Sequence, residues 1–227
     1  MSATPKPATA GTASEVEIPV GHCWVTGNLV VPAGASGIVL FAHGSGSSRH
    51  SPRNQFVARM LHEAKVGTLL FNLLTAFEEF VEARTGHLRF DIGLLAHRLI
   101  AATNWLRTDE RTEGMPLGYF GASTGGGAAL VAAAEIDVPI KAVVSRGGRP
   151  DLAGSCLPLV KAPTLLIVGA LDDPVVAMNR EAFCQLRCEK SLQIVPGATH
   201  LFEEPGTLET VGHLAADWFA KHFSPHE

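Results

Sequence analysis

The chain has 227 residues, of which 46% are hydrophobic and 18% charged, and its formal net charge is -4. This composition argues against disorder and favours one domain built around a deeply buried sheet. The negative charge gives no electrostatic footprint for nucleic acid, and no apolar run reaches the roughly 18 residues that a membrane span needs. The four cysteines are scattered and no zinc-type motif occurs, so we expect reduced cysteines, no metal and no cofactor.

The two ends of the chain differ from its middle. Residues 1–12 carry Pro, Ala, Thr and Gly but no apolar segment of the kind found in secretion signals. The sequence therefore predicts a flexible tail over 1–14, a domain over 15–222 and a short tail over 223–227. It also favours a cytoplasmic location, and it says nothing about the oligomeric state.

Strand and helix patterns alternate after a predicted antiparallel hairpin over 15–31, whose turn is Gly21-His22. Strands are predicted near 37–43, 66–71, 115–120, 140–145, 163–169 and 191–195, and helices near 52–65, 90–107, 124–135, 174–187 and 207–222. Alternation at this spacing predicts an α/β fold, with a mostly parallel twisted sheet, right-handed crossovers and helices on both faces.

A loop rich in glycine and serine, His43 to Ser48, follows the first buried strand. At this place the backbone N–H of Ser45 is a candidate donor to an oxyanion hole, and Gly44 allows a substrate to approach closely. A phosphate cradle is the competing interpretation. It is weak, because neither known glycine-rich phosphate motif is complete and Arg49 takes the last glycine position.

The segment from Leu73 to Leu88 is too short for a large lid over a site. A short helix beside the site is expected here, and its run of charges is most simply a solvated face. Little or no lid favours substrates of modest size.

Gly121-Ala122-Ser123-Thr124-Gly125 lies between a predicted strand and a predicted helix. A strand that turns abruptly into a helix at G-x-S-x-G places the serine in a strained backbone position and exposes its side chain. Ser123 is therefore the candidate nucleophile, and the N–H of Thr124 is the second candidate oxyanion donor. An ordinary structural turn is the alternative.

Two further residues complete a candidate triad. Asp172 follows the strand 163–169, on the edge where open α/β sheets place their ligands, and Asp173 is expected to cap the helix that Pro174 opens. The alternative interpretation is that both aspartates are helix caps. Among the 10 histidines, His200 follows the strand 191–195 on a loop, where it could act as general base for Ser123 while Asp172 fixes its tautomer.

Four arginines flank predicted strand ends, where a guanidinium could bind a substrate carboxylate bidentately. They are Arg49, Arg53, Arg146 and Arg149. Arg49 and Arg146 are the best candidates for substrate binding by position, and ordinary surface salt bridges are the alternative for most of the four.

With these segments together, residues 15 to 222 resemble the α/β-hydrolase superfamily, most closely the small, lid-poor dienelactone hydrolase-like esterases. The resemblance lies in His43-Gly44-Ser45-Gly46, Gly121-Ala122-Ser123-Thr124-Gly125, Gly169-Ala170-Leu171-Asp172 and Gly197-Ala198-Thr199-His200, in the family's order. Dienelactone hydrolases proper use a cysteine nucleophile where this chain has Ser123, so their substrate does not transfer directly.

The expected activity is that of a serine hydrolase acting on a small carboxylic ester or lactone through an acyl-enzyme on Ser123. An acyltransferase would use the same residues and pass the acyl group to an alcohol or thiol. A small-molecule receptor without turnover is the alternative from another class.

Overall fold

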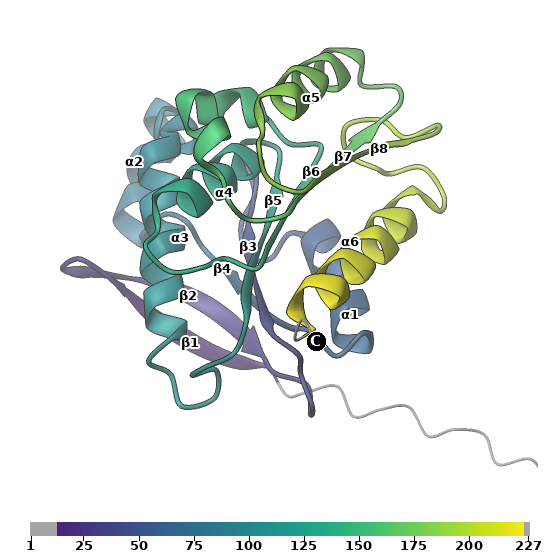
Figure 1. Cartoon of the computed structure of the whole chain (residues 1–227). Coiled ribbons are helices and arrows are strands. Elements are labelled where there is room, and N and C mark those ends of the chain that lie inside the picture. The colour runs from purple at the N-terminus through teal and green to yellow at the C-terminus, as the bar shows by residue number, and fades with distance from the viewer. Residues whose placement is uncertain (1–12, 225–227) are drawn as a thin grey trace, which may run out of the picture.

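A computed structural model of the protein describes residues 13–224, and Figure 1 shows one sheet with helices on both sides. Its strands are β1 (Ser14–Val20), β2 (Cys23–Val30), β3 (Ile38–Ala42), β4 (Gly67–Phe71), β5 (Leu117–Ala122), β6 (Ala142–Arg146), β7 (Thr164–Gly169) and β8 (Lys190–Val195). Its helices are α1 (Pro52–Glu63), α2 (Ala76–Thr85), α3 (Ile92–Leu106), α4 (Thr124–Glu135), α5 (Asp173–Gln185) and α6 (Thr207–Phe223), with 3-10 segments η1 (Leu88–Phe90) and η2 (Pro150–Leu159).

The eight strands form one sheet in the order β1-β2-β4-β3-β5-β6-β7-β8. The hairpin of β1 and β2 is antiparallel and also pairs antiparallel with β4, whereas all other neighbours are parallel. The carboxyl ends of β3, β5, β6, β7 and β8 therefore meet at one edge. Each segment that the sequence analysis proposed for the site follows one of these strands.

Two apolar cores cover the two faces of the sheet. One packs α3, α4 and η2 against the sheet around Tyr119, and the other packs α1 and α6 around Phe120. These neighbours point to opposite faces because side chains alternate along a strand. Both faces of the central strands are buried, which explains why those strands appear as continuous apolar runs in the sequence.

The predicted fold class is confirmed, with the hairpin, the mostly parallel sheet and all predicted helices present. The turn at Gly21 has φ 70°, which glycine adopts without strain. The sequence analysis did not predict η2, which bends where Gly154 leaves helical geometry. β1 begins at Ser14 and α6 ends at Phe223, while the rest of the expected tails, residues 1–12 and 225–227, lies outside the described residues.

The short helix expected between residues 73 and 88 is α2, and Thr75 begins it with a capping box to Glu78. Its charges are not simply a solvated face. Glu82 is buried and pairs with Arg89, and Glu78 pairs with Arg98 at 2.6 Å. Phe77 and Phe80 are exposed on this helix, at 74% and 55%, alongside the exposed Glu79.

Candidate active site

Ser123 lies on the sharp turn between β5 and α4. Its backbone has φ 52° and ψ -123°, a region that non-glycine residues rarely occupy and that costs about 1–3 kcal/mol. Its N–H donates to the carbonyl of Arg146 at 3.2 Å, which ties the turn to the end of β6. The predicted strained turn is thus present, and it directs the serine side chain outward at the carboxyl edge of the sheet.

The two glycines of the motif are required by close backbone contacts. A Cβ at Gly121 would collide with the carbonyl oxygen of Gly125, and a Cβ at Gly125 would collide with the carbonyl oxygen of Ala42. Any larger residue would push α4 away from the sheet, so the G-x-S-x-G pattern follows from the packing of the turn.

Asp172 and His200 form a hydrogen-bonded pair. His200 Nδ1 lies 2.6 Å from Asp172 Oδ2. Since a carboxylate only accepts, Nδ1 carries the proton and Nε2 is left as the acceptor. Asp172 occupies the N-cap position of α5 but its side chain caps nothing, whereas Asp173 is the first helical residue. The expectation that Asp173 caps this helix is therefore wrong.

Backbone contacts hold the two loops of this pair together. The N–H of Leu171 donates to the carbonyl of Ala198 at 2.9 Å, because β7 and β8 are neighbours and their loops leave the sheet side by side. Glu204 accepts from both the N–H and the hydroxyl of Thr199, at 3.1 and 2.6 Å. These bonds lower the pKa of Glu204 and fix the loop that carries His200.

Ser123 and His200 line the same cavity, of about 240 Å³, which we call the nucleophile cavity. Within the described residues Ser123 Oγ makes no hydrogen bond to His200. Such contacts in unliganded enzymes are often long and tighten when substrate binds. The nucleophile cavity is lined by Gly44, Ser45, Ser47, Ser51, Arg53, Asn54, Ala122, Ser123, Arg146, His200 and Leu201.

The two candidate oxyanion donors lie next to each other, but one of them is occupied. The N–H of Ser45 donates to Thr124 Oγ1 at 3.0 Å. The N–H of Thr124 belongs to the first turn of α4, where no intrahelical acceptor exists. Gly44 packs against the turn, since a Cβ there would lie 3.1 Å from Ser123 Cβ.

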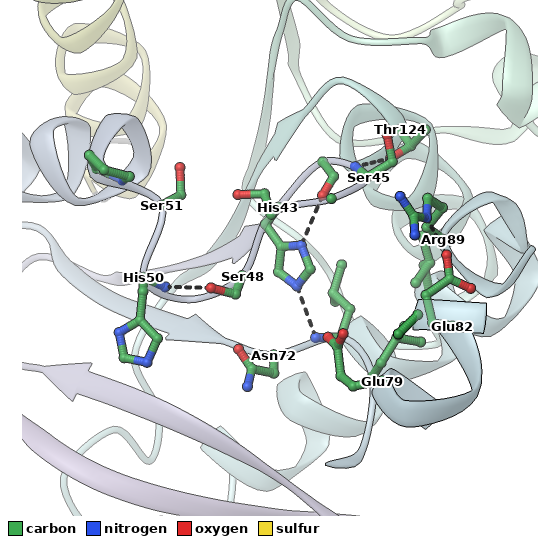
Figure 2. A pocket seen from close by; sticks show the side chains of 18 residues that line it. His43, Ser45, Ser48, His50, Ser51, Asn72, Glu79, Glu82, Arg89 and Thr124 are labelled. Carbon is green, nitrogen blue, oxygen red and sulfur yellow. Dashed lines mark hydrogen bonds and ion pairs between the residues drawn. The ribbon is translucent and has the colours of Figure 1, made fainter. Parts of the chain in front are cut away.

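The His43 side chain links this loop to the segment after β4 by two hydrogen bonds. Leu73 N–H donates to His43 Nε2 at 3.2 Å, so the proton lies on Nδ1, which donates to the carbonyl of Gly44 at 3.1 Å (Figure 2). Burial lowers the pKa of His43, which keeps the ring neutral. Position alone did not reveal this role in the sequence, because the partner amide of Leu73 comes from the end of another strand.

The buried His43 predicts a loss of stability in acid. The unfolded chain takes up a proton near the ordinary pKa of 6.5 and the folded chain only at lower pH, so the free energy of unfolding should fall as pH decreases below 6.5. Urea unfolding at neutral and acid pH would measure this slope. His43→Gln should be less stable at neutral pH and show a shallower slope, whereas His97→Gln, on an exposed position, should match the parent.

Part of the slope should persist in His43→Gln, because burial also lowers the pKa of His62. A slope as steep in His43→Gln as in the parent would show that protonation of His43 is not coupled to unfolding.

The structure separates the two arginines that the sequence analysis favoured. Arg146 lines the nucleophile cavity, since it ends β6 in register with Ala122, directly before Ser123. Arg49 pairs with Glu15 of β1 at 3.2 Å and lines neither this cavity nor the one described next. Arg53, one turn further along, lines the cavity instead. No local pattern in the sequence distinguished Arg53 from Arg49.

A second cavity, of about 580 Å³, shares lining residues of the loop 44–51 with the first. Figure 2 shows this second cavity from close by. We call it the outer cavity. Glu79 and Glu82 of α2 line it, together with Asn72 and Leu73 after β4. Burial and the nearby charge of Glu82 raise the pKa of Glu79. Gly44, Ser45, Ser47 and Ser51 line both cavities, so an extended molecule could lie across the loop.

Two structural findings concern the described residues only. Over residues 13–224, no helix is both long and apolar enough to span a membrane. In the same part of the chain, no three His, Cys, Asp or Glu side chains lie in an arrangement that could bind a metal ion.

Comparison with known proteins places the chain in a family. The sequence model of the Dienelactone hydrolase family matches residues 72–221. A dienelactone hydrolase from Anabaena variabilis, known from a crystal structure, is 61% identical to this chain in sequence. Its TM-score is 0.91, and the match covers 93% of this chain and 98% of that one. The esterase Est1E from Butyrivibrio proteoclasticus shares the fold at 15% identity, with a TM-score of 0.76 over 93% and 99% of the two chains.

A curated relative from Mycobacterium tuberculosis carries a different name. It is called "Putative phosphoribosyl transferase" and is 58% identical over 208 residues, which make up 92% of this chain and 46% of the relative. This chain thus spans about half the length of that protein. The family match includes Ser123, Asp172 and His200, and the Anabaena structure covers 93% of this chain. The chain therefore belongs to the dienelactone hydrolase family, within the α/β-hydrolase superfamily.

Proposed function

We propose that the protein is a serine hydrolase that cleaves small carboxylic esters or lactones. The observation that carries this proposal is the 2.6 Å contact between His200 Nδ1 and Asp172 Oδ2, beside a serine held on a strained turn. The contact leaves Nε2 free to accept a proton in the cavity that Ser123 lines. Dienelactone hydrolase and esterase relatives with the same fold support the reaction class.

In the first half of the reaction, Ser123 Oγ attacks the ester carbonyl carbon while His200 Nε2 takes the hydroxyl proton. The carbonyl oxygen becomes an oxyanion, which the N–H groups of Thr124 and Ser45 stabilise. Ser45 must release Thr124 Oγ1 or share its proton with the substrate. The carbon–oxygen bond to the alcohol then breaks, and His200 returns the proton to the leaving oxygen.

In the second half, water attacks the acyl-enzyme and His200 again acts as the base. The side chain of His200 is 38% exposed, so water reaches it without passing a lid. This exposure favours hydrolysis over transfer to a second alcohol. Product analysis with an added alcohol or thiol distinguishes the two, since an acyltransferase would form the new ester in preference to the free acid.

The phosphoribosyl transferase activity that the name of the mycobacterial relative suggests is not part of our proposal. This chain matches only 46% of that protein, and residues 72–221 of this chain match the hydrolase family. A phosphoribosyl transferase activity would need to be tested in the longer protein.

Labelling with a fluorophosphonate tests the proposal directly. The probe should modify Ser123, located by mapping the labelled peptide, and the rate of labelling should rise with pH because His200 must be unprotonated to act as base. His200→Gln should lose most of the rate together with this pH dependence. His213→Gln, on the exposed side of α6, is the matched control. Labelling at another residue, or an unchanged pH profile in His200→Gln, would assign the nucleophile or base elsewhere.

A further inference from the structure

We propose that the nucleophile cavity contains a phosphate-binding subsite formed by Arg53 and Arg146, and that the substrate is an ester of a phosphorylated alcohol. The ester part of this inference rests on the proposed hydrolase function. The phosphate part rests on the charges and hydrogen-bond donors around the cavity, which the ester reaction itself does not use.

The first observation is a buried cation that lacks an anion. Arg146 is 6% exposed, and of its five N–H donors the structure satisfies one, from Nη2 to Asn54 Oδ1 at 3.3 Å. Its Nε is buried with no hydrogen-bond partner among the described residues. Phe202 contributes only its ring face, 5.8 Å from the guanidinium carbon. A buried charge without a partner is costly, so a ligand that supplies negative charge is expected here.

The second observation is that the neighbouring charge is also positive. Arg53 lines the same cavity. Burial of Arg146 and then the charge of Arg53 lower the pKa of Arg146 to about 10. None of the described residues lining the cavity is acidic. Glu203 pairs with Arg53 at 3.1 Å, but the carboxylate side chain is 62% exposed and its charge is screened by water. Two cations in one cavity match a dianion better than a single carboxylate.

The third observation concerns the elements that carry the donors. Arg146 comes from the end of β6, Arg53 and Ser51 from the start of α1, and Ser47 from the loop after β3. Ser51 Oγ accepts from Asn54 N–H at 3.4 Å, which leaves its own proton to donate. The start of α1 adds the positive end of a helix dipole. Donors from three elements suit a tetrahedral phosphate, whereas a planar carboxylate needs donors in one plane.

The position of His200 indicates which side of the ester carries the phosphate. His200 returns its proton to the leaving alcohol, so the alcohol must depart toward that ring. His200 and Leu201 line the nucleophile cavity together with both arginines. The phosphate therefore belongs to the alcohol, and the acyl group extends across the loop into the outer cavity.

Binding of inorganic phosphate tests the subsite apart from catalysis. Calorimetric titration of the Ser123→Ala variant, at a pH where phosphate is mostly dianionic and at constant ionic strength, should show binding that acetate does not reproduce. Arg53→Gln in that background should weaken phosphate binding about 10- to 100-fold. Arg59→Gln, on the exposed side of the same helix, should leave it unchanged.

Hydrolysis of three matched acetates tests the substrate class. They are 2-acetoxyethyl phosphate, 3-acetoxypropanoate and neutral 2-methoxyethyl acetate. We expect kcat/KM to be highest for the phosphate ester, by about 10- to 100-fold over the neutral one, and Arg53→Gln to bring the ratio of these two kcat/KM values close to one. Arg146→Gln should also lose the preference for the phosphate ester. If that variant fails to fold, Arg146→Lys takes its place, because it keeps a buried cation and should retain part of the preference.

The outcomes separate the two proposals. Phosphate binding without hydrolysis of any ester would support the subsite and overturn the hydrolase. Hydrolysis of the neutral ester without phosphate binding, or a preference for 3-acetoxypropanoate over the phosphate ester, would overturn the phosphate subsite and leave the hydrolase in place. Equal phosphate binding by Arg53→Gln and Arg59→Gln would also overturn it.

Discussion

Ser123→Ala should lower kcat for ester hydrolysis by about 10⁴- to 10⁶-fold while the fold persists. The loss is large because the residues of a triad act as a unit, so removing the nucleophile also removes the use of the base. The rest of the turn should be unaffected, since the glycine contacts and the N–H of residue 123 remain. Hydrolysis of p-nitrophenyl acetate, together with circular dichroism and thermal unfolding, would measure both effects.

Ser155→Ala is the matched control, because Ser155 is an exposed serine in η2, away from the cavity. It should retain the parent's kcat. If folded Ser123→Ala kept more than about a tenth of the parent's kcat, the acyl-enzyme on Ser123 would be ruled out.

Asp172→Asn should lower kcat by about 10⁴-fold, because an amide in place of the carboxylate allows the wrong tautomer of His200. In the parent, Asp172 Oδ2 accepts from Nδ1 at 2.6 Å and leaves Nε2 to act as base. An asparagine can present its NH₂ group to Nδ1 instead, which places the ring proton on Nε2. KM should change little, since Asp172 is not among the residues lining the nucleophile cavity.

Asp173→Asn separates this role from helix stability. Asp173 is exposed at the start of α5, where its charge interacts with the helix dipole, so its loss should cost about 0.3–1 kcal/mol and leave kcat unchanged. The reverse result, with the rate lost in Asp173→Asn and kept in Asp172→Asn, would show that the two aspartates exchange roles.

The sequence was sufficient for features that depend on local pattern. The central strands are buried on both faces, so they appear as unbroken apolar runs, and the turn at Ser123 needs glycine on both sides. Asp172 and His200 could be selected because each follows a predicted strand on a loop, and the structure adds that β7 and β8 are neighbours, which brings the two side chains together. These inferences needed only periodicity and the rule that parallel strands end together.

The choice between Arg49 and Arg53 could not be made from the sequence. The two residues flank the start of α1, and which of them faces the cavity depends on the path of the chain before the helix. Arg49 turns to Glu15 on the hairpin, a contact across 34 residues. Arg53 lines the same cavity as Arg146, whose guanidinium donates to Asn54 of α1. Such long-range contacts leave no periodic pattern.

The burial of Glu82 could likewise not be predicted from the pattern of charges in the sequence. A run of acidic residues on a short helix predicts a solvated face, since charged side chains are rarely buried without partners. Here Arg89 and the N–H of Leu88 supply those partners. Both residues come from η1, whose position depends on how the chain turns after Gly86.

The bond from Ser45 N–H to Thr124 Oγ1 has a consequence for selectivity between ground state and transition state. A neutral ester carbonyl that replaces the threonine hydroxyl exchanges one neutral acceptor for another, with almost no gain in free energy. An oxygen that has become negatively charged accepts the same N–H about twice as strongly. Under the proposed mechanism, the resting bond therefore makes Ser45 nearly indifferent to bound substrate, and its stabilisation appears only as the tetrahedral species forms.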